Sequence, residues 1–308
     1  MKDAFFCKYI DINAKEGFFM LPERRYFLFL MKQIPSLSNV QLLKMLQYLE
    51  NYHCKQVSFL ELCDALQLRT KMKEVLITSY EKILKNEKKW QLNYQNEKFI
   101  TLLDEAYPSC LAEIYNPPVL LFYRGDIQLL SKSSLALIGS RAATSSGRKV
   151  IERLVPGLVR AGIPIVSGLA RGIDTYAHQM TIRQKGSTIA VIGSGLERTY
   201  PKENFRLQQF IAKNHLLVTE YPDDTPPFSY HFPMRNRIIA GITQGTCVVE
   251  ARRRSGTLIT AQYALEAGRS VFCVPGDSTK PTTEGCHELI QQGAKCIWKS
   301  EHIIEEFL

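Results

Sequence analysis

The chain has 308 residues, of which 45% are hydrophobic, and this length suits two domains with sizeable cores. Its net charge of +9 fits either a basic cytosolic protein or a protein with a polyanionic partner. The apolar stretch at residues 26–31 is too short to span a bilayer, and no secretory signal is recognisable. We therefore expect a cytoplasmic protein without a membrane anchor.

The eight cysteines include no Cys-x-x-Cys pair, so their spacing gives no metal-ligand pattern. We expect reduced, mostly buried thiols and no bound metal.

Residues 23–96 carry a helical pattern, whereas residues 1–20 show no clear period. Ser38 is a suitable N-cap for a helix at residues 39–52, with Val40, Leu43, Leu46 and Leu49 as its apolar stripe. Further helices are predicted at residues 57–66 and 71–85. These features predict a small all-α domain over residues 1–103, with its basic side chains on solvated faces.

Residues 99–133 differ from the helical part because proline and glycine pairs punctuate them. A short strand is predicted at residues 119–123. We expect this linker to add an edge element to the domain that follows, which spans residues 104–308.

From Leu135 onward, short apolar runs alternate with helical segments. The predicted strands are residues 135–138, 163–166, 188–192, 216–219, 246–250, 270–274 and 295–298. This alternation predicts an α/β fold with a doubly wound, mostly parallel, extended Rossmann-like sheet. In such sheets, ligands bind beyond the carboxyl ends of the strands.

Polar turns follow the predicted strands and therefore converge on one edge of the sheet. They supply glycines for close backbone approach and cations for charge. The candidate binding residues are Gly139, Ser140, Arg141, Ser167, Gly168, Arg171, Gly193, Ser194, Gly195, Lys202, Arg235, Asn236 and Arg237. Aromatic residues lie among them in sequence, at Tyr200 and in the proline-rich loop with Phe228, Tyr230, His231 and Phe232. Cations interleaved with aromatic rings suit the phosphates and unpaired bases of a single strand.

Patterns for catalysis are weak in this chain. Asp174 and His178 are four residues apart on a predicted helix, close enough for a structural hydrogen bond or for a base with its orienting partner. No Gly-x-Ser-x-Gly nucleophile turn and no His-Glu-x-x-His zinc motif accompanies them. Gly193 and Gly195 begin a dinucleotide-type turn, but Arg198 occupies the position of its third glycine.

Six ordered motifs resemble the DNA-processing protein A family, also called Smf. They read GSRAATSSG (139–147), IVSGLARGIDTYAH (165–178), IAVIGSGLERTYPKEN (189–204), FPMRNRIIAGI (232–242), EARRRSGTLITAQYALEAGR (250–269) and VPGDSTKPTTEGCHELIQQGAK (274–295). The resemblance covers about residues 107–307. The helical part is more loosely similar to the sterile-alpha-motif-like domain of some family members.

The resemblance implies a protein without enzymatic activity or cofactor that binds incoming single-stranded DNA during natural transformation. It also implies protection of that strand, loading of the RecA recombinase, and a homodimer. It implies DNA contacts at the turn of residues 139–141, at Lys202 and at residues 235–237. The matching dimerisation segment places Cys286, His287, Leu289, Ile290 and Cys296 at the interface.

Three rival functions remain open. Residues 254–257 (Arg-Ser-Gly-Thr) resemble a turn of the nucleoside-monophosphate phosphoribohydrolases, although no suitably spaced glutamate follows. The others are a nicotinamide-dependent enzyme and a dimeric scaffold that binds DNA incidentally.

Overall fold

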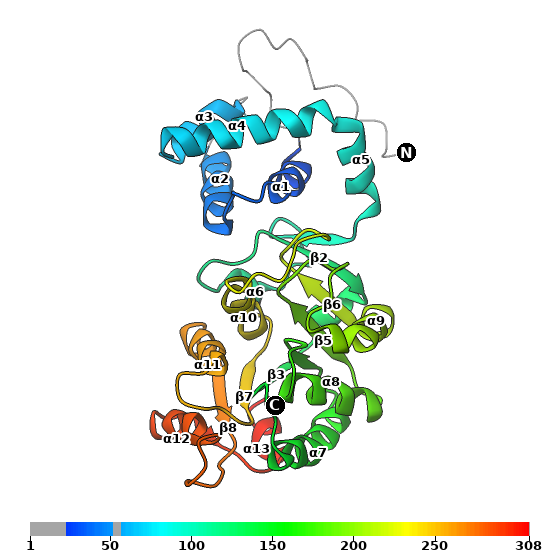
Figure 1. The fold of residues 1–308 in the computed structure, drawn as a ribbon, viewed down its shortest axis with the longest axis vertical. Coiled ribbons are helices and arrows are strands. Elements are labelled where there is room, and N and C mark those ends of the chain that lie inside the picture. Colours follow the sequence, from blue (N-terminus) through cyan, green and yellow to red (C-terminus); the bar gives the residue numbers. More distant parts are fainter. Residues whose placement is uncertain (1–22, 52–56, 308) are drawn as a thin grey trace. The chain divides into compact units, whose positions relative to one another are not determined.

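The computed structural model describes residues 23–51 and 57–307, and the predicted lead-in at residues 1–20 lies outside them. The chain divides into two compact units (Figure 1). The first unit extends to Glu97 and includes Thr101–Leu103. The second contains Lys98–Ile100 and continues from Asp104 to the C-terminus.

The described part of the first unit is helical, as the sequence predicts. Its helices are α1 (Arg24–Lys32), α2 (Asn39–Asn51), α3 (Phe59–Ala65), α4 (Thr70–Lys85) and α5 (Glu87–Asn96). Ser58 and Glu61 form a reciprocal capping box that satisfies backbone donors at the start of α3. Within the residues described, no helix of either unit is both long enough and apolar enough to cross a membrane.

The predicted stripe of α2 is partly wrong. Val40 is 44% exposed, whereas Leu42 and Met45 are completely buried together with Leu46 and Leu49. Buried positions at spacings of three, four and seven residues follow the 3.6-residue period of an α-helix. A steady three-residue step drifts off that face, which explains why Val40 points outward.

The second unit contains a sheet with nine strands in the order β1-β2-β6-β5-β4-β3-β7-β8-β9. The strands are β1 (Phe99–Thr101), β2 (Leu120–Gly125), β3 (Leu135–Ile138), β4 (Ile165–Ser167), β5 (Thr188–Ile192), β6 (Leu216–Thr219), β7 (Gly245–Val248), β8 (Ser270–Cys273) and β9 (Lys295–Cys296). All neighbouring strands from β6 to β9 run parallel. The predicted doubly wound, extended Rossmann-like fold is confirmed.

The segment before β3 adds the edge element that the sequence predicts, and this element runs antiparallel to β6. Strand β2 pairs with β6, with Phe122 opposite Thr219. Strand β1 lies outside β2, and Tyr123 donates its backbone N–H to the carbonyl of Lys98. The buried residues Leu120–Phe122 anchor this edge in the core.

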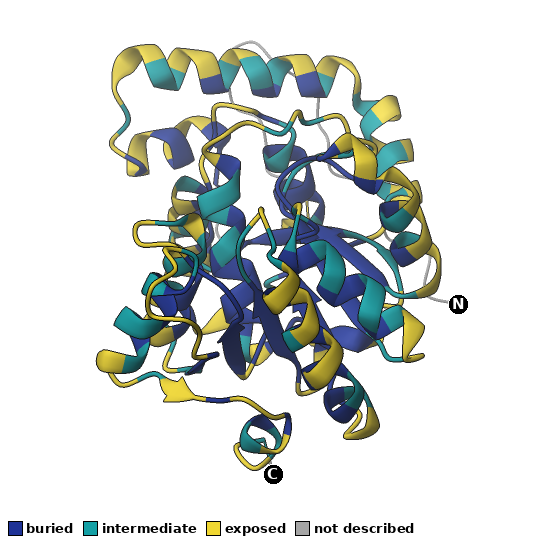
Figure 2. Cartoon of the chain, turned by 60° about the horizontal axis from the view of Figure 1, so that its bottom comes forward, coloured by how far each residue is buried: buried dark blue, intermediate teal, exposed yellow. Residues whose placement is uncertain are grey.

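Helices cover the central strands. The longer ones are α7 (Ser145–Arg160), α8 (Ile173–Arg183), α9 (Phe205–Asn214), α10 (His231–Gly241), α11 (Gly256–Glu266) and α12 (Glu284–Gln291). Short turns are α6 (Ser109–Ala112), α13 (Glu301–Ile304), η1 (Ile127–Ser131) and η2 (Lys202–Asn204). Leu135 and Leu137 of β3 pack with α7 and α8 in one core cluster. The central strands are accordingly dark blue in Figure 2.

The order in which successive strands join the sheet reverses beside β3. The chain passes from β3 through β4 and β5 to β6, then returns to place β7 on the other side of β3. This arrangement makes the carboxyl ends of β3 and β7 a topological switch point, where open α/β sheets bind ligands.

Candidate nucleic-acid interface

The turn after β3 lies directly on the start of α8. Ile173 donates its backbone N–H to the Ser140 carbonyl over 3.1 Å. Gly172 has a φ of +76°, and a Cβ there would lie 2.3 Å from the Ser140 oxygen. Only glycine therefore allows α8 to begin so close to the turn that carries Arg141.

The segment after β5 is fixed to the turn after β4. The buried Asn204 amide donates to the Leu169 carbonyl and to the Thr175 hydroxyl, each over 2.8 Å. The exposed side chains of Arg171 and Glu203 form an ion pair across the same junction. These contacts place η2, and with it Lys202, next to the β4 turn.

A small cleft of about 50 Å³ lies where the turns after β3, β4 and β5 meet. Its lining residues are Arg141, Gly168, Ala170, Arg171, Ile192, Gly193, Ser194, Tyr200, Pro201, Phe232 and Arg235. The Arg141 guanidinium lies 5.6 Å from the centre of the Phe232 ring. Lys202 follows Pro201 and is exposed. The structure thus brings Arg141, Arg171 and Lys202 to one edge of the sheet.

Several predicted polar contacts are already used within the fold. Gly168 donates its N–H to Asp174 over 3.2 Å, and Gly195 donates its N–H to the Thr225 carbonyl over 2.9 Å. The hydroxyl groups of Ser167 and Ser194 donate to backbone carbonyls. The expectation that the glycines of these turns let a ligand approach their backbone is wrong for the N–H groups of Gly168 and Gly195, which already have partners. Burial requires such donors to find partners inside the protein.

Three more predicted residues serve the turns in different ways. The Gly193 carbonyl lies 3.1 Å from the His231 ring nitrogen Nδ1, so this turn is tied to α10. The Ser140 hydroxyl accepts the N–H of Ala142 over 3.1 Å. Gly139 packs against α8, because a Cβ there would lie 2.7 Å from the Ile173 side chain.

Arg235 is only 4% exposed, although it lines the cleft. Its Nη1 donates to the carbonyls of Gly168 and Val191, and its Nε donates to Asn236 over 3.0 Å. Burial lowers the pKa of Arg235 to about 10. Because this value is still well above 7, the guanidinium is charged at neutral pH. Arg235 therefore holds together the ends of β4 and β5 and supplies a buried positive charge beneath the cleft.

Arg237 does not share this position. Its guanidinium forms a 2.6 Å ion pair with Glu220, and both side chains are 4% exposed. Residues two apart on a helix point in widely different directions, so Arg235 and Arg237 cannot serve one groove. The prediction that Arg237 lines the groove is wrong, whereas Asn236 is half-buried and lies beside the start of α11.

Exposed aromatic rings lie near the cations. Tyr200 is 45% exposed, Phe228 is 45% exposed and Tyr230 is 64% exposed. Phe228 and Tyr230 stack with their ring centres 5.6 Å apart. The predicted aromatic loop is shorter than expected, because α10 already begins at His231.

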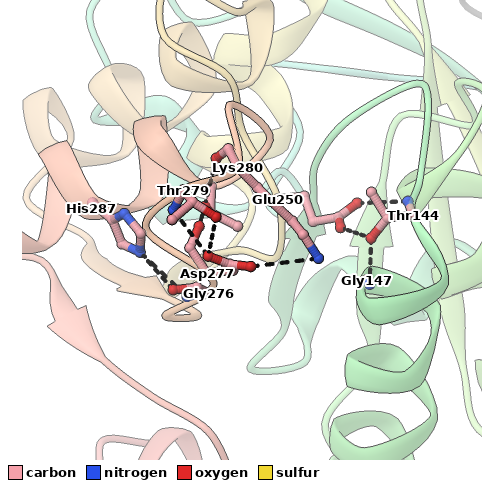
Figure 3. A network of polar contacts seen from close by, with 9 residues as sticks. Thr144, Gly147, Glu250, Gly276, Asp277, Thr279, Lys280 and His287 are labelled. Atoms are coloured by element: carbon pink, nitrogen blue, oxygen red, sulfur yellow. Dashed lines mark hydrogen bonds and ion pairs between the residues drawn. The ribbon is translucent and has the colours of Figure 1, made fainter.

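Glu250 has a structural role that the sequence did not reveal. Thr144 donates its backbone N–H to this buried carboxylate over 3.0 Å and its hydroxyl to the other oxygen (Figure 3). The Thr144 hydroxyl also accepts the N–H of Gly147 and so caps α7. The segment that follows β7 thereby fixes the start of α7. A threonine just before a helix is a local signal for an N-cap, and Thr144 carries that signal for α7. Its partner Glu250 could not be found in this way because it is distant in sequence.

The predicted interface residues divide into two groups. Cys286 and Leu289 are buried within the unit, and burial raises the pKa of the Cys286 thiol to about 12. His287 contacts Gly276 (Figure 3), Ile290 is half-buried and Cys296 is exposed. The three-residue spacing puts Cys286 and Leu289 on the inner face of α12. They are thus not surface contacts, whereas an interface role for His287, Ile290 and Cys296 stays a prediction.

Asp174 and His178 do not form the expected pair. Asp174 accepts the backbone N–H of Gly168 and Ala170, while His178 Nδ1 lies 2.7 Å from the Thr188 hydroxyl. Both side chains are buried. Over the ranges that the structure describes, no cluster of histidine, cysteine, aspartate and glutamate could hold a metal ion.

His178 should make the protein less stable in mild acid. Burial, reinforced by the positive charges of His215 and Arg235, lowers its pKa to about 3 from an ordinary value near 6.5. The folded state thus binds this proton less readily than the unfolded state. Its contribution is complete above pH 6.5 and falls by about 1.4 kcal/mol per pH unit below that. Urea unfolding at pH 7, 6 and 5 measures the free energy of unfolding. This free energy should fall more steeply with decreasing pH in the native protein than in His178→Gln. Parallel curves for the two proteins would contradict this assignment.

Comparisons with known proteins identify the family of the chain. A family model described as DNA recombination-mediator protein A matches residues 98–308. The chain belongs to the DNA recombination-mediator protein A family. The resemblance inferred from the six motifs is confirmed, and membership gives the chain a role in DNA processing as a recombination mediator.

Relatives of this recombination-mediator family match different shares of the chain. DNA processing protein DprA of Streptococcus pneumoniae is 42% identical over 271 residues, which span 88% of this chain and 94% of that protein. DNA processing protein DprA of Bacillus subtilis is 48% identical over 208 residues, or 67% of this chain and 70% of that protein.

Solved structures of the same family extend the comparison. The X-ray structure of the Streptococcus pneumoniae protein matches with a TM-score of 0.86 and 41% identity, covering 94% of this chain and 99% of that chain. A structure of DNA processing protein A from Helicobacter pylori matches with a TM-score of 0.61 and 28% identity, covering 68% of this chain and 96% of that one. That structure is described as giving insights into a single-stranded DNA binding mode. The 94% coverage means that the similarity includes most of the helical unit, which the motifs alone matched only loosely.

Proposed function

We propose that this family member binds single-stranded DNA without sequence preference, protects it, and loads RecA onto it during natural transformation. The observation that carries the proposal is the meeting of exposed cations and exposed aromatic rings at the carboxyl edge of the sheet. A single strand offers both a phosphate chain and open base faces, and this edge suits both.

Arg141 and Lys202 are the main phosphate contacts in this proposal. Both side chains are exposed at the edge, whereas the charge of Arg171 is partly offset by Glu203. Arg235 supports the site from below by fixing the turns after β4 and β5. Bases stack on Tyr200 and on the exposed pair formed by Phe228 and Tyr230.

Salt should weaken this binding in a defined way. Each neutralised phosphate of a single strand contributes about −0.7 to the slope of log affinity against log salt concentration. Two phosphate contacts therefore predict a slope of about −1.4 or steeper. Fluorescence anisotropy with labelled oligothymidylate at several salt concentrations measures the slope, with a duplex of equal length as control. A slope near zero, or equal affinity for the duplex, would contradict the proposed site.

The protein partners of the proposal are RecA and a second copy of the chain, in the cytoplasm. Family membership supports them. RecA loading is tested by the rate at which RecA filaments form on oligothymidylate, with Arg141→Ala as the matched variant that should fail to accelerate it. Light scattering reports the dimer. An accelerating effect independent of Arg141, or a monomer at working concentration, would contradict the corresponding part.

We propose that the protein performs no catalysis at this edge. Residues 254–257 resemble a turn of the phosphoribohydrolases, and Glu250 is a carboxylate close to them in sequence. This carboxylate already accepts two hydrogen bonds from Thr144. Incubation with nucleoside monophosphates should release no free base. Base release that is lost in Glu250→Gln would favour the enzyme instead.

A further inference from the structure

A larger pocket of about 650 Å³ adjoins the small cleft. The turn after β3 lines it with Ser140 and Arg141, and the segment after β7 lines it with Arg252 and Ser255–Thr257. It therefore lies at the switch point between β3 and β7, and its volume is that of a small-ligand site.

The wall after β7 is the N-terminus of α11. This helix has 11 residues, Gly256–Glu266, and its N-cap residue Ser255 makes no side-chain capping bond. The first amides of a helix have no partner inside the helix, and the helix dipole makes this end partly positive. The wall thus offers backbone donors and positive potential to an anion.

Two hydroxyl groups at the same wall have no hydrogen-bond partner among the residues that the structure describes. Thr260 is 3% exposed and lines the pocket, and its hydroxyl has no hydrogen bond to any residue that the structure describes. The Ser255 hydroxyl is also buried without a partner among those residues. Asn236 of α10 donates to the Gly256 carbonyl over 3.4 Å and so holds the start of α11 in place. Buried polar groups normally find partners, so the buried Ser255 hydroxyl, together with the Thr260 side chain that lines the pocket, indicates a polar ligand.

The remaining lining is mixed. The exposed Arg252 contributes a cation. Ile138, Ile239, Ile259 and Pro233 supply apolar surface. Asp174 is the one carboxylate of the lining in the described chain, and its oxygen already accepts the amides of Gly168 and Ala170. Cationic and donor groups on an apolar wall suit a phosphate joined to a sugar and base.

We propose that the N-terminus of α11, with Ser255, Thr260 and Arg252, binds a nucleotide phosphate in addition to those at Arg141 and Lys202. The inference rests on the proposed function, because it extends the strand's path from the turns after β3, β4 and β5 across the switch point to the end of β7. The shared chemistry is a nucleotide phosphate, which comes from the interior of a strand or from a terminal phosphate.

The test compares Arg252→Gln and Thr260→Val with Arg253→Gln. Arg253 is the matched control, because it has the same charge, pairs with Glu288 and is not part of the pocket lining. The probe is labelled oligothymidylate with a 5′-hydroxyl, measured by anisotropy at several salt concentrations. We expect several-fold weaker binding for Arg252→Gln and Thr260→Val, and a salt slope shallower by about 0.7 for Arg252→Gln. Affinities and slopes equal to those of Arg253→Gln would overturn the inference.

Two further arms separate the possible outcomes. Thymidine monophosphate and a 5′-phosphorylated oligomer are added as competitors of the labelled oligothymidylate to identify the source of the phosphate. If both compete, and Thr260→Val abolishes this competition, the site at α11 binds a terminal phosphate. A native protein that binds no oligothymidylate would refute the proposed function. Native binding that weakens in Arg141→Ala but not in the α11 variants would refute this inference alone. Thermal unfolding of each variant verifies that the fold is kept.

Discussion

Replacing Arg141 or Lys202 with alanine is expected to weaken the binding of single-stranded DNA about 10-fold or more. Hydrogen bonds to charged groups contribute about 1.5–3 kcal/mol, and about 1.4 kcal/mol corresponds to a tenfold change in affinity. Neither cation forms an ion pair with any residue in the described ranges, so both are available to phosphate. Because both side chains are exposed, their removal should leave stability almost unchanged.

Arg160→Ala is the matched control for these variants. Arg160 is an exposed arginine in the last turn of α7, at the end of the helix away from the β3 turn. Its loss removes the same charge without removing a contact at the carboxyl edge. Anisotropy titrations of the single variants and of the double variant measure the effect. If the alanine variants at residues 141 and 202 bind as tightly as Arg160→Ala, the assigned edge is wrong.

Arg237→Met is expected to destabilise the fold by about 3–5 kcal/mol, because it leaves the buried Glu220 carboxylate without its ion-pair partner. The double variant Arg237→Met/Glu220→Met should recover most of this loss. Replacing a buried ion pair with apolar side chains of similar volume is often neutral or stabilising. Arg237 also has two buried nitrogens, Nε and Nη1, without a partner among the described residues, which favours the recovery.

Urea unfolding of the two single variants and the double variant gives the coupling free energy directly. At a temperature where Arg237→Met stays folded, its affinity for oligothymidylate should equal that of the native protein. Arg124→Met is a control, because its ion pair with Asp223 is more exposed and should contribute less. A stable Arg237→Met protein with weakened DNA binding would mean that Arg237 contacts DNA after all.

The central strands could be predicted almost residue by residue. Strands β3, β5 and β6 have the bounds that the sequence indicates. A strand buried on both faces reads as an unbroken apolar run, and glycine or polar residues mark its end. Strands β4 and β7 differ from the prediction. The strand predicted from Ile163 starts at Ile165, after Pro164, which has no N–H to donate, and the strand predicted at residues 246–250 is Gly245–Val248.

The use of each polar group at the edge could not be predicted. The sequence places Arg235 and Arg237 in one motif, yet their two-residue spacing sends one to the cleft and the other to Glu220. Likewise, Gly168 and Gly195 donate their backbone N–H groups to partners that lie close to them only in the folded chain. Local pattern predicts where a turn lies, whereas the partner of a buried donor depends on contacts between distant segments.

The same limit applies to α11 and α12. A sequence motif identifies the Ser-Gly-Thr turn, but the buried Ser255 hydroxyl without a partner in the described chain, and the place of Thr260 in the pocket lining, become visible only in the folded protein. In α12, matching a segment to a family's interface does not separate inner from outer positions. Helical period does so, and it assigns Cys286 and Leu289 to the core.

A crystal structure of the protein with a short oligothymidylate tests the central claim most directly. The account predicts backbone phosphates beside the Arg141 guanidinium and the Lys202 ammonium group at the carboxyl edge of the sheet, with bases against the exposed rings. A strand bound elsewhere on the protein, with that edge empty, would contradict it.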